Sequence, residues 1–134
     1  MPKSKFIENN SPTWRQFLNH TAGTTQSGFA DHYEGDTIPT IKESLLGKIP
    51  RYDKEIDFLF TPGTGWAYSG GGYVIVQMAL EDTFKKPISE LAATYIFKPL
   101  GLKNTTMIQP NEKGFPTNVA LVHETIISWC AYYI

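Results

Sequence analysis

Three consecutive glycines, Gly70 to Gly72, stand directly before the clearest helical pattern in the chain and constrain its fold more than any other feature. Glycine weakens a helix interior, so this run predicts a point where the backbone turns sharply or approaches another group closely. The spacing of residues from about Gly71 to Phe84 predicts a helix. Its apolar stripe is Tyr73, Val76, Leu80 and Phe84, and its polar stripe is Gln77, Glu81 and Lys85. We expect this helix to carry the core of the chain.

Capping signals predict two shorter helices before it. Thr13 and Gln16 fit a capping box, so a first helix should begin at Thr13. A second helix is expected from Thr40 to Leu46, because Thr40 and Glu43 fit another capping box and Gly47 is a good C-terminal stop. The apolar face of the first helix should consist of Trp14, Phe17 and Leu18.

Irregular structure is expected between these helices. The first helix should end near His20, and residues 21–39 show no periodicity, which indicates a long loop. Residues 48–67 are predicted to be extended or irregular, with a turn at Pro62–Gly63.

A fourth helix is predicted from about Ile88 to Phe97. Lys98 precedes Pro99, which should move Lys98 out of the helical region and end the helix. The residues that match the amphipathic template are Ile88, Leu91, Ala92, Tyr95 and Ile96. No long alternating strand pattern appears, so the chain is predicted to be mainly α.

Composition excludes several classes of function. The chain has 134 residues, enough for one domain, and its formal net charge is −1. That balance gives no field that would attract nucleic acid or an anionic membrane. No apolar run reaches the roughly 20 residues of a membrane span, and no signal peptide is visible, so the compartment stays open. The single cysteine, Cys130, excludes an internal disulfide.

The sequence predicts no metal and no cofactor. The histidines and carboxylates lack ligand spacing and are expected to be solvated, and the glycines lack the Gly-Lys-Ser/Thr of a phosphate loop. The residues considered were His32, His123, Glu34, Asp36, Asp53, Glu55 and Asp57, with Gly63, Gly65 and Gly70 to Gly72 for the loop.

Four phrases occur in order along the chain: Phe17 to Gly23, Pro62 to Tyr73, Lys86 to Leu91 and Ile96 to Thr105. Together they resemble the β-lactamase-like serine hydrolases, the superfamily of β-lactamases, D,D-peptidases and related esterases. The first resembles that family's Leu-Leu-x-His-Thr-Ser-Gly phrase. The second resembles its Pro-Gly…Tyr-Ser-Asn…Gly-Tyr phrase, and the last resembles its Pro-Leu-Gly-Met…Thr phrase.

The resemblance implies a fold. The chain would be a fragment, the helical lobe of the α/β β-lactamase/transpeptidase-like fold, with the sheet lobe largely absent. Residues 1–12 would be a frayed N-terminal segment and residues 13–118 the helical part of the hydrolase domain. Residues 119–134 match nothing recognisable and would be a truncated or frame-shifted tail. The family is often periplasmic or extracytoplasmic.

The resemblance also implies site residues. In this family an acyl-enzyme forms on the serine of a Ser-x-x-Lys motif. The lysine and the tyrosine of a Tyr-x-Asn motif share the general-base work. Tyr68 falls on that tyrosine, and Ser69 and Gly70 fall on the next two positions as candidate substrate-binding residues. Glycine lacks the asparagine amide, which disfavours β-lactam and peptide substrates and favours a small-molecule ester.

The chain also departs from the family pattern. None of its serines is followed by lysine three residues later, and neither Lys-Thr-Gly nor His-x-Gly occurs. A tyrosine needs nearby cationic charge to act as a base at neutral pH, and the lysine that would supply it is missing. The isolated chain is therefore expected to be inactive. It would be a fragment of a hydrolase of esters or amides, a non-catalytic pseudoenzyme, or half of a split protein that needs a complementing N-terminal half.

A second enzyme class fits one motif. Residues 67–71 approximate the nucleophile elbow of α/β-hydrolases, which would make Ser69 the nucleophile. That elbow requires a β-strand before the serine, and residues 61–65 are a poor strand.

Structural roles compete with functional ones at three aromatic positions. Tyr68 would be an aromatic residue that packs at a helix entry. His20 would use its ring to bond nearby backbone at a helix end. Trp66 would belong to the core or to a pocket wall.

Overall fold

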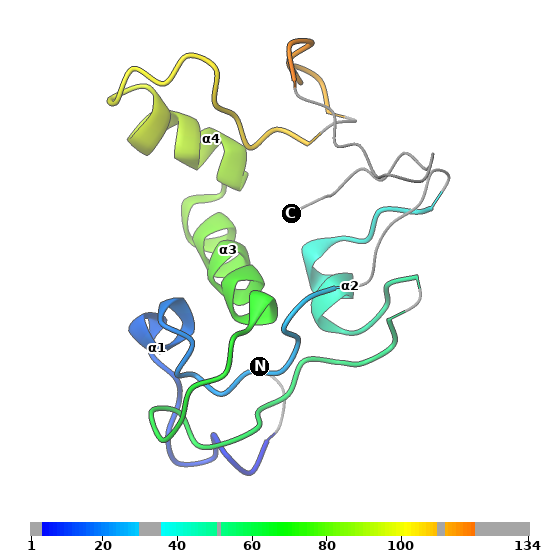
Figure 1. Ribbon diagram of the computed structural model, residues 1–134, viewed down its shortest axis with the longest axis vertical. Coiled ribbons are helices and arrows are strands. Elements are labelled where there is room, and N and C mark those ends of the chain that lie inside the picture. The colour runs from blue at the N-terminus through cyan, green and yellow to red at the C-terminus, as the bar shows by residue number, and fades with distance from the viewer. Residues whose placement is uncertain (1–3, 30–35, 51, 110–111, 120–134) are drawn as a thin grey trace, which may run out of the picture. The chain divides into compact units, whose positions relative to one another are not determined.

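The computed structural model describes residues 4–29, 36–50, 52–109 and 112–119 (Figure 1). Their elements are α1 (Trp14–Leu18), α2 (Ile41–Leu45), α3 (Gly70–Phe84), α4 (Ile88–Ala92) and the π-helix η1 (Ala93–Phe97). Two isolated antiparallel bridges occur, and these residues contain no strand. The predicted mainly α class, that of a helical lobe without its sheet, is confirmed. Residues 1–78 and 79–134 form two compact units, which are described separately.

Both short helices begin at the predicted capping boxes. The Gln16 backbone N–H donates to Thr13 Oγ1 at 3.3 Å, and the Thr13 N–H donates to Gln16 Oε1 at 2.8 Å. The Glu43 N–H donates to Thr40 Oγ1 at 3.2 Å, while the N–H and hydroxyl of Thr40 both donate to the Glu43 carboxylate. These hydrogen bonds from Thr40 hold the pKa of Glu43 below its ordinary value.

The predicted stop of α2 is confirmed at Gly47, which has φ +67°. A Cβ atom at Gly47 would lie 2.5 Å from the carbonyl carbon of Lys54, so the position requires glycine for two reasons. The predicted apolar face of α1 is wrong in part. Phe17 is buried in the core cluster, whereas Trp14 and Leu18 are 56% and 48% exposed and do not belong to that cluster.

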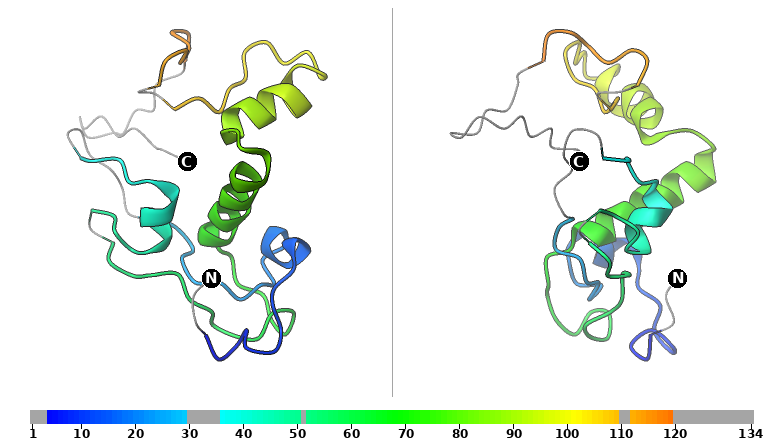
Figure 2. Two further views of the ribbon diagram at one scale, coloured as in Figure 1. Left: turned by 180° about the vertical axis from the view of Figure 1, so that it is seen from behind. Right: turned by 90° about the vertical axis from the view of Figure 1, so that its right-hand side faces the viewer.

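The irregular segments predicted around α2 pair with each other. The Leu59 N–H donates to the Gly23 carbonyl at 2.7 Å, and the Thr25 N–H donates to the Asp57 carbonyl at 2.9 Å. The Asp57 N–H donates in turn to Thr25 Oγ1 at 2.8 Å. Figure 2 shows these segments from two further sides, where they pass beside each other near the start of α3. This pairing fixes the loop after α1 although no regular sheet forms.

The predicted apolar stripe of α3 is wrong in part, because only Val76 of its four residues packs against the core. The buried residues of α3 are Gly71, Gly72 and Ile75. A Cβ atom at Gly71 would lie 2.7 Å from Gln26 Oε1 and 2.8 Å from Ile56 Cδ1, so neighbouring segments lie directly against the helix backbone. Hydrophobicity does not mark such a contact, because glycine contributes no side chain to the pattern. The stripe residues that are exposed instead are Tyr73, Leu80 and Phe84.

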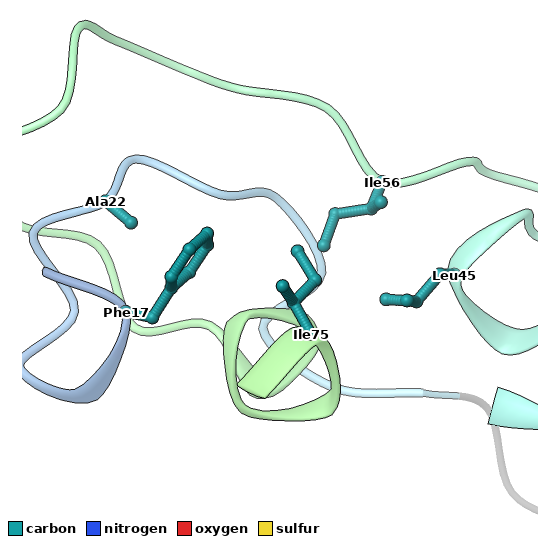
Figure 3. Close-up of a cluster of buried hydrophobic side chains, with 5 residues drawn as sticks. All are labelled: Phe17, Ala22, Leu45, Ile56 and Ile75. Carbon is teal, nitrogen blue, oxygen red and sulfur yellow. The ribbon is translucent and has the colours of Figure 1, made fainter. Parts of the chain in front are cut away.

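The core of residues 1–78 is small and brings distant segments together. Figure 3 shows Ile75 of α3 between the Phe17 ring on one side and Leu45 and Ile56 on the other, with Ala22 beyond Phe17. Partly buried Ile41, Val74, Val76 and Met78 pack against this cluster. The core therefore depends on both short helices and the N-terminal half of α3.

Residues 79–134 contain the fourth predicted helix in a modified form. The expected helix from Ile88 to Phe97 is α4 followed directly by η1. Leu91 and Ala92 are buried as expected, whereas Tyr95 and Ile96 are 66% and 49% exposed. The backbone N–H of Ile88, at the start of α4, donates to Glu81 Oε1 at 2.8 Å. A side-chain pair also spans the start of α4, since Lys86 donates to Glu90, and this hydrogen bond raises the pKa of Lys86.

The predicted effect of Pro99 on Lys98 is wrong. Lys98 keeps helical angles of φ −63° and ψ −50°. The chain continues turning, because the Leu100 N–H donates to Ile96 O at 3.1 Å and the Gly101 N–H donates to Lys98 O at 3.1 Å. The turn ends at Gly101, where φ is +67°. Proline therefore removes one donor here without breaking the turn.

Some of the residues considered in the sequence are not among those that the structure describes. His32, Glu34, His123, Cys130 and the tail from residue 120 lie outside the described residues. Asp53, Glu55 and Asp57 are exposed, as predicted, and Asp36 is half-buried. Where the structure is described, no helix is long and apolar enough to cross a membrane.

Candidate active site at the start of α3

The Tyr68-Ser69-Gly70 segment leads directly into α3. Ser69 is almost fully buried at 1% exposure. Its hydroxyl donates to the Thr25 carbonyl at 2.6 Å, and its Oγ accepts from the Gly72 N–H at 3.0 Å. Ser69 therefore caps the N-terminus of α3 and joins it to the loop after α1.

This environment bears on the roles considered for Ser69. The nucleophile elbow of α/β-hydrolases presents an exposed serine Oγ after a β-strand. Here the Oγ is buried and already hydrogen-bonded, and no strand precedes it in the described residues. These observations count against Ser69 as a nucleophile and favour a role in holding its neighbours in place.

Tyr68 has the opposite environment. Its side chain is 57% exposed, and its ring centroid lies 4.5 Å from that of His20. The tyrosine of the motif thus lies at the surface, directly before the serine that caps α3. Trp66 is 65% exposed, so the core role considered for it is wrong.

His20 connects the first and second phrases of the sequence. Its Nδ1 accepts the backbone N–H of Ser69 at 3.2 Å, which confirms that the ring bonds backbone at the end of a helix. The partner was not foreseeable, because it lies 49 residues further along the chain. The carbonyls of Thr25 and Gln26, which accept from Ser69 and Gly71, were likewise invisible in the sequence.

The three glycines are not equivalent. A Cβ atom at Gly70 would make only ordinary contacts, with the Ser27 carbonyl oxygen nearest at 3.4 Å. At Gly72 it would lie 3.0 Å from Thr24 Oγ1, and at Gly71 the contacts are shorter still. A Cβ atom at Gly71 therefore needs the Gln26 and Ile56 side chains to move, whereas the position of the family's asparagine, Gly70, has room for a Cβ atom.

An exposed tyrosine at the glycine-rich start of the longest helix, held by a His-Thr-x-Gly turn, fits the β-lactamase-like class of serine hydrolases. A family model described as Beta-lactamase matches residues 2–123. The chain therefore belongs to the β-lactamase family of serine hydrolases.

Individual relatives agree with the family. A Salmonella typhimurium protein named "Putative D-alanyl-D-alanine carboxypeptidase" is 29% identical over 123 residues, which cover 90% of this chain and 27% of that protein. Penicillin-binding protein 4* of Bacillus subtilis is 26% identical over 95 residues, which cover 69% of this chain and 20% of that protein. The chain thus aligns with about a quarter or less of the length of these relatives. No solved structure matches it.

Replacing Ser69 by alanine should destabilise the chain. The change leaves the Gly72 N–H and the Thr25 carbonyl without the buried hydroxyl that now joins them. Each group left unpaired costs about 1–3 kcal/mol, so we expect a loss in the free energy of unfolding of about that size or somewhat more. Urea denaturation measures it, with Ser89→Ala on α4 as the control. A loss no larger than the control's would contradict the capping role.

Proposed function

We propose that this chain carries the general-base tyrosine segment of a serine hydrolase that cleaves an ester or amide by acyl transfer. In this proposal Tyr68 is the general base, and the cap formed by Ser69 holds it at the start of α3. The observation that carries the proposal is the contrast between the two residues, since Tyr68 is 57% exposed and Ser69 is 1% exposed. A base must reach solvent and substrate, and its support must not move.

The nucleophile is proposed to come from outside this sequence. None of the chain's serines has the spacing of Ser-x-x-Lys, and no Lys-Thr-Gly or His-x-Gly is present. A complementing polypeptide that carries these motifs would complete the site, and the chain alone would form no acyl-enzyme. The substrate is proposed to be a small ester in preference to an amide, because Gly70 offers no side-chain amide to a substrate.

The isolated chain should therefore show no hydrolysis of a chromogenic β-lactam or of p-nitrophenyl acetate above the buffer rate. Without a nucleophile, only general binding effects remain to accelerate the reaction. A fluorophosphonate probe followed by mass spectrometry should leave every serine unlabelled. Stoichiometric labelling that disappears in Ser69→Ala would overturn the proposal and restore the nucleophile elbow.

A further inference from the structure

His20 bonds to the backbone on both sides of Tyr68. The Ala67 N–H donates to the His20 carbonyl at 3.0 Å, and the Ser69 N–H donates to His20 Nδ1 at 3.2 Å. His20 thus accepts the backbone N–H groups of both sequence neighbours of the proposed base. Two bonds at adjacent points restrict the direction in which the Tyr68 side chain leaves the backbone.

The His20 ring also lies among the aromatic residues of this segment. Its centroid is 4.5 Å from the ring of Tyr68, 5.3 Å from that of Tyr73 and 6.0 Å from that of Trp66. The Tyr68 and Tyr73 rings are tilted by 42° and 37° to the imidazole, and Trp66 meets it edge-on at 82°. These distances fall in the range of attractive aromatic pairs. The imidazole therefore contacts the proposed base directly as well as fixing its backbone.

His20 is itself held in place. Its backbone N–H donates to the Phe17 carbonyl at 3.3 Å, and its backbone adopts φ +62°, the left-handed region in which histidine, asparagine and aspartate are the most frequent residues after glycine. The Tyr73 hydroxyl donates to the Leu18 carbonyl at 2.8 Å, which fastens the first turn of α3 to the end of α1. Because Phe17 is buried in the core, its hydrogen bond with the His20 backbone connects the residue that carries the imidazole to the core.

We propose that His20 is the positioning residue for Tyr68, acting through its Nδ1 as an acceptor; this role rests on the proposed function. The hydrogen bond requires an Nδ1 without a proton, so the neutral imidazole must carry its hydrogen on Nε2. An imidazolium would direct a second N–H at the Ser69 N–H and could not make this bond.

Two substitutions of His20 test the hydrogen-bond acceptor and the aromatic ring separately. His20→Asn keeps an acceptor oxygen at the δ position and tolerates positive φ, but removes the ring. His20→Phe keeps a ring and removes the acceptor. In amide hydrogen exchange of the full chain, His20→Phe should lower the protection of the Ser69 N–H by about tenfold, the factor that one ordinary hydrogen bond contributes. His20→Asn should retain most of it.

The Ala67 N–H is an internal control, because it donates to the backbone carbonyl of residue 20 in every variant. Its protection should hold in His20→Phe, and the Tyr68 ring signals should shift in that variant. Unchanged protection at Ser69 together with unchanged Tyr68 signals would overturn the proposal. If His20→Phe does not fold, 15N spectra of the neutral imidazole in the unaltered chain decide the matter. A protonated Nδ1 there would exclude the acceptor role.

A chimera tests the link to catalysis. In it, this chain replaces the aligned quarter of the Salmonella relative, and esterase activity is measured. His20→Phe should lower kcat, and His20→Asn should restore part of it, with little change in KM. If Tyr68→Phe lowers kcat but His20→Phe does not, the positioning role is wrong while the proposed function stands. If neither lowers kcat, the proposed function fails, although the exchange data still decide whether the Nδ1 bond exists.

Discussion

Replacing Phe17 by alanine should lower the free energy of unfolding by about 3–5 kcal/mol, the usual range for truncating a buried phenylalanine. Phe17 is 1% exposed and belongs to the cluster that α1, α2 and α3 share. A Cβ atom at Gly72 would lie only 3.5 Å from its ring, so the α3 backbone itself lines the site. Glycine cannot fill the resulting cavity.

Such a loss is a large fraction of the roughly 5–15 kcal/mol that stabilises a typical domain. Urea denaturation followed by circular dichroism measures it. Leu18→Ala is the matched control, because it lies on the same helix and is 48% exposed, and it should cost about 1 kcal/mol or less. Equal losses at both positions would mean that the cluster in Figure 3 does not carry the stability of this chain.

In the chimera that restores a nucleophile, Tyr68→Phe should lower kcat on an ester by about 10²–10⁴-fold, the range that general-base catalysis contributes. The change removes only a hydroxyl from a side chain that is 57% exposed, so the melting temperature should hold. Stopped-flow or steady-state hydrolysis of p-nitrophenyl acetate gives kcat, and a thermal melt gives stability.

Tyr73→Phe is the control with the opposite expectation. It removes a hydroxyl that donates to the Leu18 carbonyl at 2.8 Å, so it should lower stability by about 1 kcal/mol and change kcat little. The two tyrosines lie five residues apart and both contact the His20 ring, which makes the pair a strict comparison. Full activity in Tyr68→Phe would show that Tyr68 packs against His20 and does no chemistry. The pseudoenzyme reading predicts that even the unaltered chimera is silent.

Many large apolar side chains of the described residues are exposed to solvent. Large apolar residues are exposed on α1, α3 and η1, including Trp14, Phe84 and Tyr95, and Leu100 after η1 is exposed as well. A hydrophobicity pattern alone assigned Phe84 and Tyr95 to buried faces. The pattern was right about the helices and about Leu91 and Ala92, and wrong about several other side chains, because burial requires a neighbouring segment and periodicity supplies none.

The sequence by itself determined the features that depend on contacts over three or four residues. Both capping boxes and the glycine stop after α2 follow from such local bonds. The four motif phrases also indicated the family, because their residue types, order and spacing can be compared with those of the family from the sequence alone. None of these depends on where distant segments meet.

Only the tertiary structure decided which face of α3 is buried and which groups the motif residues contact. Gly71 lies against Gln26 and Ile56, Ser69 bonds to Thr25 across 44 residues, and His20 bonds to Ser69 across 49. Sequence fixes the donors and acceptors, but a hydrogen bond forms only where packing brings them within about 3 Å. A glycine face and a buried serine cap carry no hydrophobic signal, so the contacts around Tyr68 depend on the packing of the loop after α1 against the start of α3.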